Sequence, residues 1–357
     1  MLKRILLFCM LVIAASQPTF AQGLPGGGLG GESDRIDGKF KFIPLPYIDY
    51  HRAIGWSFGA IPIGMFNLSE KDTLSPSSMA GLFGMYSTNE TWFAMGFGML
   101  YLDEDRWRVM FAGGTGDINY QFYVNSPINQ WIKYNTNADF AYIGVQRRII
   151  PKLYAGVNYI YTSFKTKTDI FEGGGTDLHG AGLKGTWDAR SNVSYPRSGY
   201  YLEASYTTYP ALFGNTQISN RIELTYNHFF STRQKTDVIA TRVYSGIGLG
   251  DVNFNQQFIV GGTDIRGYSF GQFRGNYLVA AQGEYRYNFW KRFGAVGFAG
   301  LATIFGASNE DDNGRLIPGA GFGVRYTYLK DTHSNVGFDI GWGDGDWGIY
   351  FRFSEAF

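Results

Sequence analysis

The feature that most constrains how this chain can fold is a strict alternation of apolar residues with small or charged ones. Along residues 320–328 every second side chain is apolar, and Gly321, Gly323, Arg325 and Thr327 stand between them. Successive side chains of a β-strand point to opposite faces of the sheet, so a period of two predicts strands. No segment beyond the N-terminal leader has a helical period. We therefore expect an all-β chain.

The two faces of these strands predict where the sheet lies. In residues 222–230 one face carries aliphatic and aromatic side chains, and the other carries charged and polar ones. A soluble sandwich would cover its outer face with Lys and Glu, whereas this pattern is typical of a sheet with lipid outside and a polar lumen inside. Because unpaired backbone groups are costly in hydrocarbon, such a sheet has to close. The sequence predicts a transmembrane antiparallel β-barrel with a polar lumen.

Alternating segments separated by Gly, Asn, Asp and Pro give the strand count. We expect about sixteen strands, an even number that suits a bacterial barrel. They are predicted at 39–50, 54–68, 76–89, 90–103, 106–124, 134–148, 151–164, 178–190, 200–209, 215–231, 237–249, 276–289, 292–305, 316–329, 334–342 and 346–357. A long loop precedes the twelfth strand.

The N-terminal residues are predicted to direct export. Lys3 and Arg4 precede an apolar run, so residues 1–21 are interpreted as a cleaved signal peptide. Residues 22–38, rich in glycine, are interpreted as a flexible periplasmic linker, and residues 39–357 as the barrel. Cys9 is the only cysteine and lies in the expected signal peptide, which excludes disulfides and thiolate chemistry from the mature chain. The expected location is the bacterial outer membrane.

Composition and spacing argue against catalysis, cofactors and nucleic acid. The formal net charge is +1, so there is no electrostatic case for a nucleic-acid partner. Ser269 stands in a G-x-S-x-G pattern, but a nucleophile elbow needs a strand before it and a helix after it, and neither is expected there. The histidines are scattered, and no cluster of His or acidic residues has metal-ligand spacing. We expect no enzyme activity, no cofactor and no metal site.

The segment "GGTDIRGYSF" (261–270) carries a resemblance to a known family. It is similar to the bacterial surface antigen superfamily, which includes the barrels of the assembly factor BamA and the translocation factor TamA. The resemblance implies that this loop folds back into the barrel and that its tip is an (I/V)-R-G-(F/Y) motif. The motif residues are Gly261, Gly262, Ile265, Arg266, Gly267 and Tyr268.

The strand after the loop supplies the expected partner of Arg266. The resemblance implies a lumen-facing acid, and the alternation of residues 277–289 places Glu284 on the polar face. An arginine and a carboxylate in a confined site can pair bidentately. The second acid of the family's pattern is replaced by Gly300, which leaves Arg266 to pair with Glu284 alone or with Asp339 as well. Other lumen-facing charges are expected at Arg286, Arg325 and Arg352.

Further matches extend the resemblance over nearly the whole mature chain. A turn similar to the family's D-x-R…P-x-x-G contains Asp188, Arg190, Pro196 and Gly199. The chain ends in a stretch that resembles a barrel-assembly signal, with Phe351, Phe353 and Phe357, although Glu355 interrupts its alternation. Pro44 and Pro46 are expected to weaken pairing of the first strand, because proline donates no ladder hydrogen bond.

One departure limits the functional prediction. Family members that assemble or translocate proteins carry periplasmic POTRA domains, and a linker of about 17 residues cannot hold a domain, which begins near 50 residues. We expect a barrel without POTRA domains that serves outer-membrane protein or lipid biogenesis as part of a larger assembly. The expected partners are outer-membrane lipid, lipopolysaccharide, and other assembly proteins or lipoproteins. The alternatives are a loop-gated channel or transport barrel, and a structural anchor for a partner lipoprotein.

Overall fold

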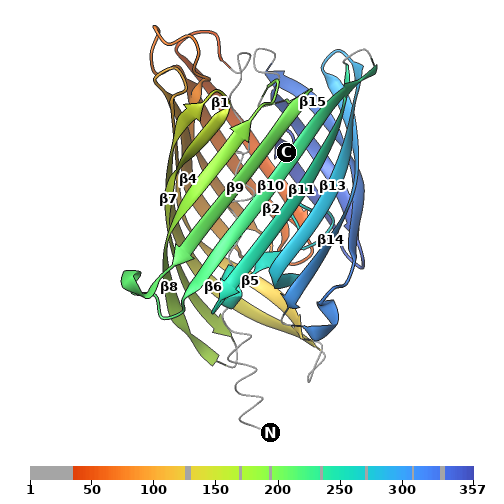
Figure 1. The fold of residues 1–357 in the computed structure, drawn as a ribbon. Coiled ribbons are helices and arrows are strands. Elements are labelled where there is room, and N and C mark those ends of the chain that lie inside the picture. The colour runs from red at the N-terminus through yellow and green to blue at the C-terminus, as the bar shows by residue number, and fades with distance from the viewer. Residues whose placement is uncertain are drawn as a thin grey trace.

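The strands form one closed antiparallel barrel (Figure 1). A computed structural model describes residues 35–124, 130–168, 171–192, 195–233, 236–269, 272–307, 309–329 and 334–357. The barrel strands are β1 (Phe40–His51), β2 (Gly55–Phe66), β3 (Ser78–Ser87), β4 (Trp92–Leu102), β5 (Trp107–Val124), β6 (Gln130–Ile150), β7 (Leu153–Thr168), β8 (Phe171–Asp188), β9 (Gly199–Tyr209), β10 (Ser219–Thr232), β11 (Asp237–Gly250), β13 (Arg274–Trp290), β14 (Phe293–Ala307), β15 (Ile317–Leu329), β16 (Ser334–Gly343) and β17 (Trp347–Phe353). The fold class predicted from the alternation is confirmed.

The connections between these strands contain a short strand and short 3-10 helices. The two-residue strand β12 (Phe258–Ile259) pairs with β13 within the long connection from β11 to β13. Among the described residues are the 3-10 helices η1 (Ala211–Phe213), η3 (Phe254–Gln256) and η4 (Glu310–Asp312). In the described part of the chain no helix is long and apolar enough to cross a membrane.

Several strand boundaries differ from the prediction, those of β6, β7, β10 and β17 by up to four residues and that of β8 by seven. Two of these differences have a clear physical reason. β8 begins seven residues before the predicted 178, because its polar start still pairs with β7 through the backbone, which needs no apolar side chains. β17 ends at Phe353 instead of 357. Ser354 has a φ of 68°, which lies outside the extended region and turns the chain away from the sheet.

The outer face of the barrel is apolar around its circumference. Phe58, Leu82 and Leu183 are each more than half exposed, and their strand neighbours on either side point the other way. Trp56 and Phe58 stack on this face, as do Tyr287 and Phe289. Exposed aromatic and aliphatic side chains in this density are expected of a surface solvated by lipid.

The prediction of a polar lumen is wrong for one part of the wall. Many lumen-facing positions of β1–β5 are Ile, Met or Phe, and the buried ones form one apolar cluster with Ile36 and Phe353. In these strands both faces are apolar, so the alternation that predicted a polar interior from the later strands does not hold here. Charged lumen-facing side chains lie instead on β8–β11, on β13 and on β15–β17.

The signal peptide predicted at 1–21 lies outside the described residues. Of the segment predicted as a linker, residues 35–38 are described and make specific contacts. The Ile36 side chain is buried, and its backbone N–H donates to Ser77 Oγ at 2.9 Å. Arg35 donates to the carbonyl of Ser75 at 3.1 Å. The chain therefore enters β1 already fixed against the β2–β3 connection.

Candidate functional site

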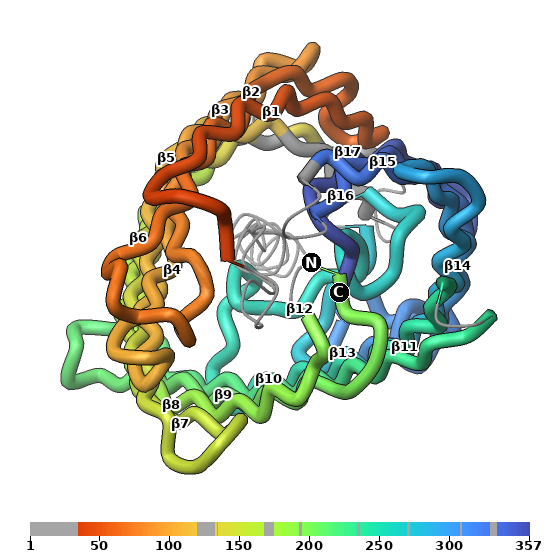
Figure 2. The backbone as a smooth tube through the Cα atoms, turned by 90° about the horizontal axis from the view of Figure 1, so that it is seen from above, coloured from red at the N-terminus to blue at the C-terminus, as the bar shows by residue number. Residues whose placement is uncertain are grey.

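The connection between β11 and β13 lies within the ring of strands (Figure 2). Its apolar side chains pack against the facing wall of β11, β13, β14 and β15. Those from the connection are Phe258, Val260, Ile265, Tyr268 and Phe273. A long segment inside a barrel also needs polar contacts, because its backbone N–H and C=O groups are removed from water and must find hydrogen-bond partners.

Arg266 is the central polar anchor of this connection. It is fully buried, and its Nη2 lies 2.6 Å from a carboxylate oxygen of Glu284 on β13. Its Nη1 lies 2.6 Å from a carboxylate oxygen of Asp339 on β16. The guanidinium plane also lies over Phe298, 3.4 Å from the ring centroid. Of the two alternatives open from sequence, the structure therefore has Arg266 pairing with both acids.

The residues beside Arg266 fix the backbone of the tip. Gly267 has a φ of 114°, and a Cβ there would meet the Trp342 backbone at 2.4 Å, so only glycine fits. Its N–H donates to the Tyr350 hydroxyl at 2.8 Å. The Tyr268 hydroxyl donates to the carbonyl of Pro318. The carbonyl of Gly262, in the Gly261–Gly262 pair, accepts from Arg352 at 3.4 Å.

Gly300 has a steric role in place of the expected acid. A Cβ at Gly300 would come within 2.7 Å of Ile265 Cδ1, and one at Gly319 within 2.5 Å of Ile265 Cγ2. The tip of the connection therefore sits in a depression formed by glycines of β14 and β15. Asp339, two strands away from Gly300, carries the second negative charge.

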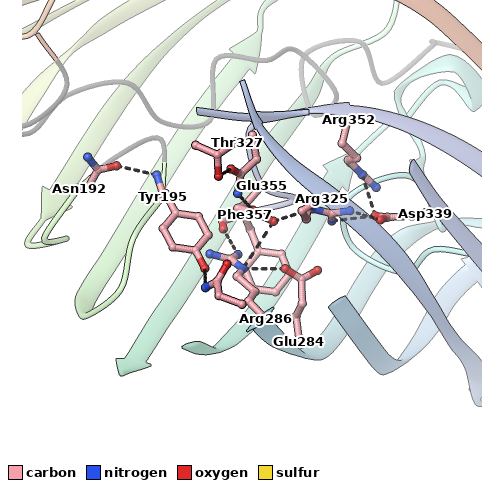
Figure 3. A network of polar contacts seen from close by, with 12 residues as sticks. Asn192, Tyr195, Glu284, Arg286, Arg325, Thr327, Asp339, Arg352, Glu355 and Phe357 are labelled. Atoms are coloured by element: carbon pink, nitrogen blue, oxygen red, sulfur yellow. Dashed lines mark hydrogen bonds and ion pairs between the residues drawn. The ribbon is translucent and has the colours of Figure 1, made fainter. Parts of the chain in front are cut away.

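From Glu284 and Asp339, the two acids that hold Arg266, a network of arginines and carboxylates extends to the C-terminal residues (Figure 3). Arg286 Nε contacts Glu284 at 2.8 Å, and Arg352 Nε contacts Asp339 at 3.3 Å. Arg325 contacts both Asp339 and Glu355. Burial makes each of these charges energetically costly unless it is paired, so removing one member of the network leaves its partners as unpaired buried charges.

The residues after β17 fold into the barrel. Glu355 accepts from Asn335 Nδ2 at 2.6 Å and from Arg325 Nε at 3.0 Å. The main-chain oxygen of Phe357 accepts from Arg286 at 2.7 Å. The Phe357 ring packs in a cluster with Tyr195 and Phe229. Glu355, the residue that interrupts the expected assembly signal, is thus the one that ties this segment to the network.

The structure adds partners that sequence reasoning missed. Asp264 pairs with Arg242 at 3.0 Å, and Asp346 accepts from the backbone N–H of Ser269 at 2.6 Å. Asp264 lies within the 261–270 segment but is not one of its motif residues, and Asp346 lies outside the segment, so no local sequence pattern indicated either contact. The D-x-R turn forms as a local pair, with both Asp188 oxygens 2.8 Å from Arg190 nitrogens.

The barrel closes through a weak seam between β1 and β17. Two residue pairs, Tyr50 with Ile349 and His51 with Gly348, join these strands, whereas twelve pairs join β1 to β2 and seven join β16 to β17. The Tyr50 and Trp347 rings stack at the same end, 4.7 Å apart. Toward the other end, Phe351 meets lumen-facing Tyr47 edge-on at 6.5 Å. Phe353 joins the apolar cluster of β1–β5.

Ser269 and the described histidines do not make a catalytic arrangement. His51 lies 3.3 Å from Asp49, His179 contacts Tyr159, and His228 contacts Tyr226. Across the described ranges no group of three or more His, Cys, Asp or Glu side chains could hold a metal ion. The chemistry of this site is ion pairing, which positions segments of the chain.

Comparisons with known proteins agree with this geometry. A family model described as the Omp85 superfamily domain matches residues 78–357. A search of curated proteins finds no match. The solved structures similar to this chain include BamA from Haemophilus ducreyi lacking POTRA domains 1–3, with a TM-score of 0.58 and 14% identity over 89% of this chain and 70% of that one.

Two other similar structures are of CdiB. The one from Acinetobacter baumannii has a TM-score of 0.61 and 14% identity over 89% of this chain, and the one from Escherichia coli has 0.61 and 12% over 88%. This chain spans 60% and 63% of their respective lengths. At these identities the likeness concerns the fold.

Proposed function

The chain belongs to the Omp85 superfamily, and from that membership we propose that it acts in outer-membrane protein or lipid biogenesis by opening its wall at the β1–β17 seam. Barrels of this superfamily are in general non-enzymatic transporters or assembly factors. In this proposal the protein is exported by its N-terminal residues and is the membrane component of a larger assembly. It would meet lipid, lipopolysaccharide and partner proteins or lipoproteins there.

The observation that carries the proposal is the two-residue pairing of the seam. A net backbone hydrogen bond contributes about 0.5–1.5 kcal/mol, so the ladder hydrogen bonds lost on opening two pairs cost far less than those lost on opening any hairpin of the barrel. Pro44 and Pro46 lie in the part of β1 beyond the β17 pairs, and neither has an N–H to donate. A strand edge of this kind can accept another strand or admit lipid.

The positions of the network's carboxylates support the same proposal, because they lie near the last strands and not on β1. Its carboxylates, Glu284, Asp339 and Glu355, lie on β13, on β16 and after β17. Phe357 extends the anchoring to β10 and β11 through its ring cluster. The ion pairs of this network thus join the last strands to the long connection, and none of these ion pairs involves β1. Opening at β1 would leave the network intact.

A disulfide across the seam tests this function. Tyr50 and Ile349 are register partners on the outer face. The Cα atoms of antiparallel register partners are close enough for a disulfide, whether or not the pair is hydrogen-bonded. The variant Tyr50→Cys/Ile349→Cys should fail to complement a deletion strain when oxidised and should complement when reduced. The control Tyr226→Cys/Val243→Cys places the same bond within the β10–β11 hairpin and should complement in both states.

Transport through the lumen is the competing function. A loop-gated channel would conduct ions in planar bilayers and would do so equally with the seam locked. Stable conductance together with complementation by the oxidised seam variant would contradict the proposal. A silent barrel whose locked form fails to complement supports it.

A further inference from the structure

Three cationic side chains gather at one end of the barrel. Arg233 follows β10, and Lys291 and Arg292 form the turn between β13 and β14. β11 pairs directly with β13, so the two connections are neighbours on the rim. Arg233 Nη2 donates to the carbonyl of Asn288, just before the second turn, at 2.7 Å. We call Arg233, Lys291 and Arg292 the basic rim.

Exposed aromatic rings lie beside the basic rim because of a β-bulge. The register of β13 against β14 shifts between Asn288 and Trp290, so the consecutive side chains of Phe289 and Trp290 are 52% and 60% exposed. Strict alternation would expose only one of them, and a bulge re-aims the other. The Trp290 ring stacks on Phe293 with 5.7 Å between centroids, and Phe293 meets Tyr326 of β15 at 5.1 Å. Trp290, Phe293 and Tyr326 thus form one aromatic row on the outer face.

The cations of the β13–β14 turn lie over this aromatic row. Lys291 Nζ is 5.5 Å from the centroid of the Trp290 ring, and the Arg292 guanidinium carbon is 5.9 Å from that of Tyr326. Arg292 Nη1 also donates to the Tyr326 hydroxyl at 3.3 Å. A cation within about 6 Å of an aromatic ring is attracted to its face. The aromatic row therefore keeps both positive charges at the outer surface of the barrel.

Carboxylates balance only part of the charge of the basic rim. Arg233 pairs at 2.7 Å with Asp237, whose side chain is fully buried, and its guanidinium lies over the Tyr287 ring. Within the described ranges, neither Lys291 nor Arg292 has a carboxylate at ion-pair distance. These two positive charges are thus uncompensated by the described part of the chain, and they match a ligand that carries negative charge.

The basic rim lies at the end of the barrel where β1 begins. Neighbouring strands pair antiparallel, which puts the connections after β2, β10 and β13 at that end. The periplasmic linker expected before β1 makes this the periplasmic end, where the leaflet of an outer membrane consists of phospholipid. Aromatic girdles of transmembrane barrels lie at the membrane interface, and long basic side chains beside them reach the headgroups.

We propose that the basic rim and the aromatic row bind an anionic phospholipid of this leaflet. Lys291 and Arg292 contact its phosphate, which a guanidinium binds through two parallel hydrogen bonds. An acyl chain packs on the exposed rings of Trp290 and Phe293, which offer large apolar surfaces. Basic residues close to a membrane surface are attracted to anionic lipids. The site lies on β13–β15, outside the seam, so it does not rest on the proposed function.

Native mass spectrometry of the folded barrel tests this site. The protein in detergent is mixed with equal amounts of phosphatidylglycerol and phosphatidylethanolamine, and the retained lipid molecules are counted. We expect the wild type to retain phosphatidylglycerol in preference. Lys291→Gln/Arg292→Gln should lower the retained phosphatidylglycerol about tenfold, because two of the charges that attract anionic lipid are lost. Equal retention of both lipids by the wild type, or of phosphatidylglycerol by variant and wild type, would overturn the proposal.

A matched variant separates this site from a general effect of charge. Arg106→Gln/Lys152→Gln removes two exposed cations from other turns at the same end of the barrel. Arg106 lies 3.4 Å from Asp103 and 3.5 Å from Glu104, so its charge is already compensated. This variant should retain as much phosphatidylglycerol as the wild type, and heat-modifiable migration confirms that both double variants are folded. An equal loss of lipid in the two double variants would overturn a specific site.

Discussion

Arg266 and Asp339 are 73 residues apart in sequence, and the arginine Nη1 lies 2.6 Å from a carboxylate oxygen of the aspartate. The contact joins the long connection to β16, next to the last strand. Glu284 completes the coordination from β13 at 2.6 Å. Because the guanidinium is fully buried, both acids are needed to offset its desolvation.

Removing the charge of Asp339 should destabilise the barrel. Asp339→Asn leaves Arg266, Arg325 and Arg352 short of a carboxylate and is expected to cost about 3–5 kcal/mol of unfolding free energy. Guanidinium unfolding in detergent micelles measures it. Asp344→Asn is the matched control, because Asp344 is more than half exposed beside Arg315 and should cost less than about 1 kcal/mol. Equal effects of the two variants would refute the buried network.

A methyl group at Gly267 should displace the tip of the connection. In Gly267→Ala the new Cβ would meet the Trp342 backbone at 2.4 Å in a backbone region unfavourable to alanine. We expect faster proteolysis within residues 251–273. Limited proteolysis with mass spectrometry of the fragments measures the cleavage rate and locates the cleaved sites. Gly283→Ala, where a Cβ meets no atom within 4 Å, should leave the cleavage rate unchanged.

Glu355 should control the position of the C-terminal residues. Glu355→Gln removes the charge that Arg325 contacts at 3.0 Å, and we expect Phe357 to leave its cluster with Tyr195 and Phe229. Carboxypeptidase digestion should then release the last residues faster than in the wild type. Glu310→Gln, at an exposed 3-10 helix, serves as the control. Resistance equal to wild type in Glu355→Gln would show that the ring cluster alone holds the segment.

The connection between β2 and β3 should loosen in acid. Burial acts to raise the pKa of Asp72, but hydrogen bonds from the Ser75 hydroxyl and from the backbone N–H groups of Ser75, Glu104 and Leu74 outweigh it and lower the pKa. A lowered folded pKa stabilises the connection above the unfolded pKa, about 3.9, and this stabilisation is lost as pH falls through the folded value. A spin label at Thr73 should become more mobile below about pH 4. Asp72→Asn should be mobile at every pH.

Much of the barrel could be predicted from local pattern. The alternation on β10, β13 and β15 is strict, so strand type and facing were correct there, including the orientation of Glu284. On β17 the alternation alone places Phe351 and Phe353 toward lipid, whereas both pack against the lumen-facing cluster of β1–β5. It failed on β1–β5, where Ile63 and Met79 face inward while Phe58 and Leu82 face outward. When both faces are apolar, hydrophobicity carries no information about orientation, and register against neighbouring strands decides it.

Site residues that belong to the loop motif could be predicted from the sequence. Ion pairs between residues far apart in the sequence could not. The resemblance placed Arg266 beside Glu284, and it left Asp339 as one of two alternatives. The pairing of Asp264 with Arg242 and the inward course of Glu355 depend on which strands lie across the barrel. Local sequence does not encode that relationship, although the charge at Glu355 was a departure from the expected alternation.

The separation of β1 from the last strands is the most direct test of the account. Spin labels at Phe42→Cys on β1 and Phe338→Cys on β16 span the seam from exposed outer positions, and Cys9 is the only native cysteine. A control pair, Tyr206→Cys on β9 with Ile239→Cys on β11, is on the same outer face and is offset along the fully registered β9–β10–β11 ladder. Pulsed electron paramagnetic resonance in bilayers should give a second, longer distance for the seam pair and one narrow distance for the control. A single narrow distance for both pairs would contradict an opening seam.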